Sequence, residues 1–264
     1  MKTAFVVLGM HRSGTSSTAG ALALAGAAPP QTLMRPAPDN PKGFWESDVV
    51  VALNDRILAS HGSSWSDWQA LPSCLGVDFA QEAAAVLASE FNDAPVIVLK
   101  DPRICRFYPF WREILEGAGY RPAVVIPLRH PAEVARSLNA RNQMALEDGA
   151  KLWLRHVLEA ELSSRSHPRH FMMWPSFLQD WRSQFKLMAV RLGVEMHAGS
   201  ESGVDGFLSS ELRRQKADDE DFLPELGQRV FGLLASLATR GEDACVHRVL
   251  DHVLAEFERA CVRA

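Results

Sequence analysis

The sequence predicts an α/β fold in which helices cover both faces of a doubly wound parallel sheet. Three short apolar runs have the composition of buried parallel strands, and each is followed by a polar or turn-forming residue and then by helical periodicity. A fourth apolar run is a further strand candidate. The expected strands span residues 4–8, 95–99, 123–128 and 170–174.

Helices are expected between these strands and after the last one. Ser47 is a plausible N-cap of the second helix, and Asp78 with Gln81 forms a capping-box pattern at the third. The last two helices carry apolar residues at helical spacing, which predicts that they pack as an antiparallel pair. The expected helices span 14–25, 47–60, 78–91, 107–117, 131–141, 149–166, 176–192, 223–239 and 242–263, with loops at 27–43 and 193–221.

Length and composition favour one domain over residues 1–264, with 222–264 as a helical C-terminal extension. Hydrophobic residues make up 47% of the 264 residues, and the net charge of −4 argues against a nucleic-acid partner. No apolar run approaches the ~20 residues that cross a membrane, and the weakly hydrophobic stretch 19–28 does not favour a signal peptide. Four scattered cysteines suggest free thiols and a cytoplasmic protein.

The strand at 4–8 and the turn after it are the most informative segment. The run from Gly9 fits G-x-x-x-x-G-K-[ST], except that Thr15 stands where the lysine would be and the basic residue comes earlier, as Arg12. Backbone N–H groups and the helix dipole converge on an anion in such a turn. This predicts a P-loop NTPase-like fold, the alternative being a Gly-rich turn without a ligand. The expected phosphate-binding residues are Arg12, Ser13, Gly14, Thr15, Ser16 and Ser17.

Two further segments place charged side chains at loop and strand ends. Glu46 precedes a helix beside Phe44 and Trp45, and a carboxylate near apolar rings has a raised pKa that suits a general base. The alternative is an acid that stabilises the helix dipole. Lys100 and Arg103 follow a buried strand, where open α/β sheets bind their ligands, and are candidates for anion contacts. The alternative there is an Asp-Pro turn with solvated charges.

Two pairs of residues later in the chain are candidate nucleotide contacts. Arg129 follows the strand 123–128, and Ser137 lies in the next helix, so the two could share one phosphate; the alternative is a structural role. Arg213 and Arg214 lie in a late loop that could close over a nucleotide, the alternative being a solvated basic run.

The order of these segments resembles the sulfotransferases that use 3′-phosphoadenosine 5′-phosphosulfate (PAPS). The stretch from His11 to Ser16 matches their loop signature x-R-S-G-[ST]-[ST]. Arg129 and Ser137 have the family's spacing of an Arg at a strand end and a Ser eight residues on. The Leu-Arg-Arg at 212–214 resembles the cofactor-closing segment more loosely. The arrangement is most similar to bacterial carbohydrate-type sulfotransferases and, in outline, to tyrosylprotein sulfotransferases.

The resemblance implies in-line transfer of a sulfuryl group from PAPS to an acceptor hydroxyl. It implies that Glu46 is the base, that Arg12 and Lys100 stabilise charge at the reaction centre, and that Arg129 and Ser137 bind the 3′-phosphate. The loop would cradle the 5′-phosphate. Because a sulfuryl group carries less charge than a terminal phosphoryl group, neither a magnesium ion nor the missing lysine is required, and no metal site is expected.

Two other functions remain open on the sequence. An atypical P-loop small-molecule kinase would turn over magnesium-ATP and need a metal-binding Asp, for which Asp101 is the candidate. A non-catalytic nucleotide-binding protein would bind a bisphosphate without transfer. A small-molecule or glycan acceptor is expected, with a carbohydrate or glycolipid favoured because Phe44, Trp45, Trp65 and Trp68 could stack on a sugar ring; core packing is the alternative.

Overall fold

A four-stranded parallel sheet forms the centre of the protein in a computed structural model that describes residues 2–72, 74–195, 199, 201–208 and 225–262. The strand order is β2-β1-β3-β4. All four expected strands are present, with ends that shift by up to three residues. The chain winds from β1 to one side and then to the other, so the carboxyl end of β1 is the switch point where such sheets bind ligands. The strands are β1 (Lys2–Val7), β2 (Val96–Lys100), β3 (Tyr120–Leu128) and β4 (Arg169–Met173).

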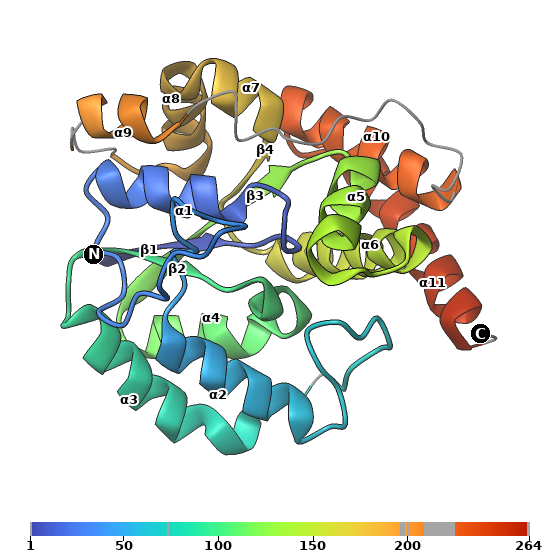
Figure 1. Ribbon diagram of the computed structural model, residues 1–264, viewed down its shortest axis with the longest axis horizontal. Coiled ribbons are helices and arrows are strands. Elements are labelled where there is room, and N and C mark those ends of the chain that lie inside the picture. Colours follow the sequence, from blue (N-terminus) through green and yellow to red (C-terminus); the bar gives the residue numbers. More distant parts are fainter. Residues whose placement is uncertain (1, 73, 196–198, 200, 209–224, 263–264) are drawn as a thin grey trace.

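Helices cover both faces of this sheet, as the sequence predicts (Figure 1). Side chains along β1 alternate between two cores: Ala4 and Val6 pack with α2, α3 and α4, whereas Phe5 and Val7 pack with α1, α7 and α8. The helices are α1 (Thr15–Leu24), α2 (Asp48–Ala59), α3 (Ala80–Phe91), α4 (Tyr108–Gly117), α5 (Pro131–Asn142), α6 (Leu146–Ser164), α7 (Trp174–Gln179), α8 (Trp181–Leu192), α9 (Glu201–Phe207), α10 (Glu225–Arg240) and α11 (Ala244–Val262), with short 3-10 helices η1 (Val77–Phe79) and η2 (Pro102–Arg106).

Three boundaries expected after the third strand are wrong. The helix expected over 176–192 is divided into α7 and α8, because Asp180 has a non-helical backbone (φ −145°, ψ 76°) and its carboxylate accepts the N–H of Ser183 (3.1 Å) to cap α8. The fourth strand ends before Trp174, which begins α7 together with a proline in the first turn. The loop expected over 193–221 contains α9, and its part from residue 209 onward lies outside the described residues.

The expected start of α2 is confirmed, and its side-chain cap forms. Ser47 is the N-cap of α2, and its hydroxyl accepts the N–H of Val50 (3.0 Å). The capping box expected at Asp78 does not form, because Asp78 belongs to η1 and α3 begins after Phe79 without a side-chain cap. A capping pattern in the sequence therefore identifies the region of a helix start, and the local backbone decides its residue.

The C-terminal helices α10 and α11 pack on each other and on α6 (Figure 1). Val230, Leu234 and Leu237 of α10 share one hydrophobic core with Leu250 and Val253 of α11 and with residues of the sheet. The apolar faces predicted for these helices are therefore both buried.

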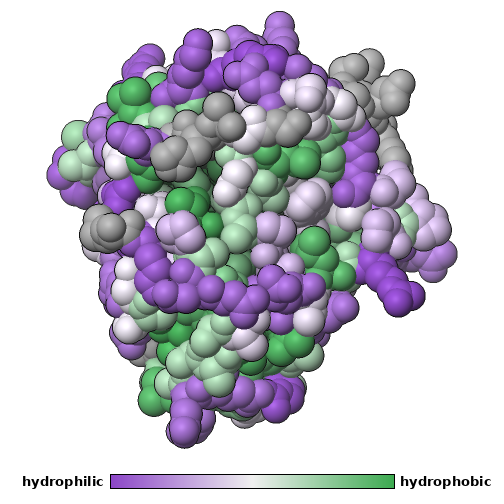
Figure 2. Space-filling view, turned by 90° about the vertical axis from the view of Figure 1, so that its left-hand side faces the viewer, coloured by the Kyte–Doolittle hydropathy of each residue, from purple (hydrophilic) through white to green (hydrophobic). Residues whose placement is uncertain are grey.

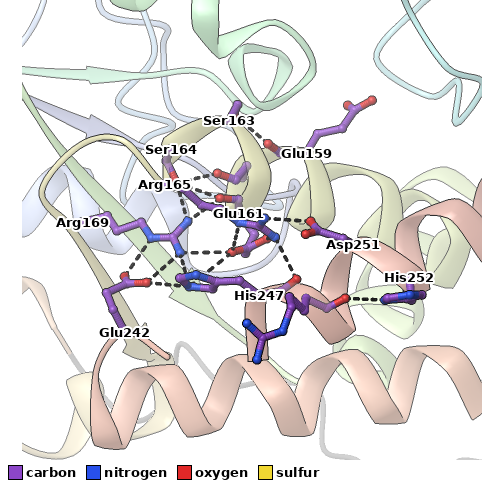
Figure 3. Close-up of polar contacts among 12 residues, drawn as sticks. Glu159, Glu161, Ser163, Ser164, Arg165, Arg169, Glu242, His247, Asp251 and His252 are labelled. Carbon is purple, nitrogen blue, oxygen red and sulfur yellow. Dashed lines mark hydrogen bonds and ion pairs between the residues drawn. The ribbon is translucent and has the colours of Figure 1, made fainter. Parts of the chain in front are cut away.

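A network of ion pairs joins the same helices to β4 (Figure 3). Arg169 of β4 pairs with Glu161 of α6 (3.0 Å) and with Glu242 (2.8 Å), and both the Arg169 and the Glu161 side chains are 1% exposed. Arg165 pairs with Glu161 (2.6 Å) and with Asp251 of α11 (2.7 Å). Since buried charges are costly unless paired, this network fixes the position of the C-terminal helices against the sheet.

Polar residues are spread over the surface near the N-terminus. Figure 2 shows this side with hydrophilic residues in a band across it and at its edges, and with hydrophobic areas above and below the band. None of the helices within the described ranges has both the length and the apolar character needed to cross a membrane. All four cysteines are free, and Cys105 and Cys261 are buried.

We expect Glu161→Gln to lower the free energy of unfolding by about 3 kcal/mol, because it leaves two arginines with one carboxylate fewer in a buried site. Urea unfolding followed by circular dichroism measures the change. Glu82→Gln is the matched control: Glu82 pairs with Arg56 at the surface, and its loss should cost less than about 1 kcal/mol. Equal losses for the two variants would show that the buried network does not hold the helices.

Candidate active site

A pocket of about 350 Å³ lies where the loop after β1, the end of β2 and the segment after β3 meet. The segment 39–46, α5 and the start of α7 complete its walls. Among the described residues expected to contact the nucleotide or to take part in the reaction, Ser13 and Arg103 are not in the pocket lining. The expected residues that line it are Arg12, Gly14, Thr15, Ser16, Ser17, Glu46, Lys100, Arg129 and Ser137. Arg213 and Arg214 lie outside the described residues.

The loop after β1 turns sharply into α1. Arg12 (φ 71°) and Gly14 (φ 92°) both have left-handed backbones, and Gly14 is the N-cap of α1. Helix geometry leaves the first N–H groups of α1 without intrahelical partners, and its first turn carries no acidic residue. The hydroxyl of Ser13 is buried without a hydrogen-bond partner among the described residues. The loop can therefore receive an anion.

Trp174 supports this loop from the end of β4. Its indole N–H donates to the hydroxyl of Ser17 (2.8 Å), and the guanidinium of Arg129 lies 4.7 Å from its ring. A Cβ on Gly14 would collide with the indole, so the close contact of loop and ring requires glycine there. Trp174 directly follows the fourth strand, and this place at a strand end could have marked it as a site residue.

Lys100 and Glu46 form a buried ion pair at the end of β2. The two residues are 3% and 2% exposed. Lys100 Nζ also donates to the carbonyl of Phe44 (3.1 Å) and to the hydroxyl of Ser16 (3.3 Å), which links the pair to the phosphate-binding loop. Burial raises the pKa of Glu46 more strongly than Lys100 lowers it. The Glu46 carboxylate is therefore a stronger base than an exposed glutamate.

Arg12 points toward α5 rather than toward Glu46. Its Nε donates to the hydroxyl of Ser137 (2.9 Å), and its Nη1 pairs with Oδ2 of Asp39 (3.2 Å). Arg141, one turn after Ser137, pairs with the same oxygen of Asp39 (3.4 Å). Ser137, which was expected to share a phosphate with Arg129, is thus in contact with Arg12 in the structure. All three residues line the pocket.

Arg129 braces the loop from β3. Its Nε pairs with Glu133 in the first turn of α5 (2.9 Å), and its Nη1 donates to the carbonyl of Arg12 (3.0 Å). Arg129 is 5% exposed, so most of its surface is covered. Arg129 therefore holds the loop backbone and lines the pocket at once.

The charges of the Asp-Pro turn after β2 are buried, so the alternative of a solvated turn is wrong. Oδ2 of Asp101 accepts from the amide of Asn54 (2.8 Å), and Oδ1 accepts from the backbone N–H (3.1 Å) and Nη1 (3.0 Å) of Arg103. Arg103 also pairs with Asp55 (2.5 Å) and is not part of the pocket lining. Arg103 therefore holds the turn after β2 and lies outside the pocket lining in which the anion is expected.

One of the four aromatic residues considered as a sugar platform, Phe44, lines the pocket. Trp45 packs edge-on against Phe207 of α9 (5.7 Å between ring centroids), and Trp65 packs in the same way against His11 (5.1 Å). Trp68 packs against the hydrophobic core. Core packing is thus the observed role of most of this set.

Eight residues of the pocket lining were not predicted as site residues from the sequence. His11 is one of them: burial lowers its pKa well below the ordinary value, and its Nε2 is without a hydrogen-bond partner among the described residues. Most of them belong to the loop that contains Arg12 or to the segment that ends at Glu46. Their closeness in sequence to these two expected residues could have identified them as site residues. They are His11, Asp39, Asn40, Pro41, Lys42, Ala140, Arg141 and Trp174.

We expect Gly14→Ala to destabilise the protein more than Gly26→Ala does. Both glycines have positive φ (92° and 107°), but nothing lies within 4 Å of a Cβ on Gly26. The left-handed backbone costs each variant about 1–2 kcal/mol, and the collision with Trp174 adds roughly 1–3 kcal/mol at Gly14. Thermal unfolding measures both variants; equal losses would show that Trp174 does not constrain the loop.

Comparison with solved structures finds sulfotransferase domains. The sulfotransferase domain from the curacin biosynthetic pathway is 14% identical, with a TM-score of 0.48 over 89% of this chain and 98% of that one. The sulfotransferase domain of the Synechococcus PCC 7002 olefin synthase is 14% identical, with a TM-score of 0.44 over 97% and 94% of the two chains. No protein-family model and no curated protein matches the sequence. Both of these structural neighbours are sulfotransferase domains.

Proposed function

We propose that the protein is a PAPS-dependent sulfotransferase that transfers a sulfuryl group to an acceptor hydroxyl. The observation that carries the proposal is the meeting of three groups in one pocket. These are the anion-binding loop with Arg12, the buried pair of Lys100 and Glu46, and Arg129 with Ser137. A loop without the P-loop lysine suits a transferred group of lower charge than a terminal phosphate.

In the proposed reaction, Glu46 accepts the proton of the acceptor hydroxyl. The oxygen forms a bond to sulfur in line with the bond that breaks, and the 5′-phosphate of adenosine 3′,5′-bisphosphate leaves with the bonding electrons. Lys100 donates hydrogen bonds near the reacting oxygens, and Arg12 offsets charge on the leaving phosphate. By analogy with phosphoryl transfer, positioning and charge stabilisation carry most of the catalysis.

The same proposal assigns the two phosphates of the nucleotide to different parts of the pocket. Gly14, Thr15, Ser16 and Ser17, together with Ser13, surround the 5′-phosphate with N–H and hydroxyl donors. Arg129 and Ser137 bind the 3′-phosphate, which distinguishes PAPS from ATP. The left-handed Gly14 at the N-cap of α1 and the unpaired N–H groups of its first turn support the assignment of the loop.

We propose a carbohydrate or glycolipid hydroxyl as the acceptor. Phe44 supports this choice, because it lines the pocket two residues before Glu46 and offers an aromatic surface beside the base. Trp45, Trp65 and Trp68 do not add to this support, since their rings pack within the protein.

The arrangement around Asp101 argues against the kinase alternative. A magnesium-dependent kinase needs a carboxylate that can reach the metal ion at a strand end. Both oxygens of Asp101 already accept hydrogen bonds from Asn54 and Arg103, in a residue that is 0% exposed. Asp101 is therefore engaged in holding the fold.

We expect adenosine 3′,5′-bisphosphate to bind without magnesium, and magnesium-ATP to bind about tenfold more weakly or worse, because ATP lacks the 3′-phosphate that Arg129 and Ser137 would contact. Isothermal titration calorimetry measures both, with EDTA present in the bisphosphate titration. Tight binding of ATP that requires magnesium would contradict the sulfotransferase proposal and support a kinase. Tight bisphosphate binding without transfer from labelled PAPS to any hydroxyl in an acceptor screen would support a non-catalytic nucleotide-binding protein.

We expect kcat/KM to fall as the pH is lowered through the raised pKa of Glu46. Only the carboxylate form can accept the proton, so the acidic limb should lie above the ordinary glutamate value of about 4.3. Glu46→Gln should remove this limb and lower turnover about 100-fold or more. Initial rates with labelled PAPS, across pH, measure both effects, with Glu82→Gln as control. A Glu46→Gln variant with normal turnover and an unchanged limb would exclude Glu46 as the base.

A further inference from the structure

We propose that Arg141 is a further ligand of the nucleotide 3′-phosphate and that Asp39 occupies its binding position until the phosphate displaces the carboxylate. The inference deepens the proposed function and rests on it. Its basis is the bridging of two arginines in the pocket by one carboxylate oxygen.

Asp39 lies between arginines from two distant segments. Oδ2 of Asp39 is 3.2 Å from Nη1 of Arg12 and 3.4 Å from Nε of Arg141. Nε of Arg12 also donates to the hydroxyl of Ser137 (2.9 Å). A carboxylate held in this way resembles a phosphate oxygen in charge and in hydrogen-bond acceptance, since both are anionic acceptors that arginine binds.

The position of Arg141 on α5 agrees with this role. Ser137 and Arg141 are four residues apart and share one face of the helix, and Glu133, which pairs with Arg129, is one turn earlier on the same face. All three arginines, Arg12, Arg129 and Arg141, line the pocket. A phosphate held by Ser137 and Arg129 therefore comes within reach of the next turn of α5.

The three acidic partners in this part of the molecule differ in how firmly they are held. Glu46 and Glu133 are buried beside Lys100 and Arg129, with side chains 3% and 1% exposed. The side chain of Asp39 is 32% exposed and stands in the segment 37–43, which is outside the helices and the sheet. Ion pairs between partly exposed side chains are weak, so a dianionic 3′-phosphate that binds Arg141 can displace this carboxylate.

The charge of an incoming nucleotide makes displacement necessary. A 3′-phosphate and a carboxylate beside the same arginine, Arg141, would repel each other, since like charges at short range in a partly covered site are destabilising. Asp39 lowers the affinity for the phosphate, and it keeps Arg12 and Arg141 ordered before the nucleotide arrives. The substitution Asp39→Asn keeps the size of the side chain and removes the negative charge that competes with the phosphate.

Calorimetry with three probes tests the inference: adenosine 3′,5′-bisphosphate, 5′-AMP and inorganic phosphate. Arg141→Gln should weaken bisphosphate binding about tenfold and change 5′-AMP binding less than about twofold, because 5′-AMP lacks the 3′-phosphate. Asp39→Asn should strengthen bisphosphate binding about threefold or more. Arg56→Gln, which removes a surface arginine paired with Glu82, is the control and should change neither affinity.

The outcomes separate this inference from the proposed function. Normal bisphosphate binding by Arg141→Gln, or an equal loss for bisphosphate and 5′-AMP, overturns the role of Arg141 while the sulfotransferase proposal stands. Weaker binding by Asp39→Asn overturns the role of Asp39. If the wild-type protein binds inorganic phosphate, loses this binding on Arg141→Gln and does not bind the bisphosphate, the anion site is supported and the proposed function is contradicted. If neither the bisphosphate nor inorganic phosphate binds, both this inference and the proposed function are overturned.

Discussion

Parallel hydrogen bonding of β1 to both β2 and β3 determines where the functional segments of this protein meet. Val7 at the end of β1 is in register with Lys100 of β2 and with Val125 of β3. Because parallel strands end at one edge of the sheet, the loop after β1, Lys100 and Arg129 come together at that edge. The pocket depends on this pairing, since a shift of register would move Lys100 away from the loop or turn its side chain to the other face.

Charge compensation is the second constraint on the pocket. Basic side chains gather there although the protein has a net charge of −4. Acidic neighbours offset the unfavourable free energy of bringing these positive charges together. Lys100 pairs with Glu46, Arg129 pairs with Glu133, and Asp39 bridges Arg12 and Arg141. Buried cations without such partners would destabilise the fold, so the same acids that shape the site also stabilise it.

Local patterns in the sequence were sufficient for most of the fold. Continuous apolar runs identified all four strands, because strands buried on both faces need apolar side chains throughout. Ser47 was correctly expected to cap α2, since its hydroxyl reaches the N–H of Val50 within one turn. The division of the helix at Asp180 was missed, because apolar spacing continues through it and a cap competes with helix propagation at that residue.

The sequence by itself determined the loop from Gly9 to Ser17, the four strands, and the placing of basic residues at strand ends. Tertiary structure alone decided which residues distant in the sequence these side chains contact. Lys100 meets Glu46 across 54 residues, and Arg12 meets Ser137 across 125. Spacing along a chain carries no information about contacts over such separations, because they depend on strand order and on the packing of α1 and α5 at the sheet edge.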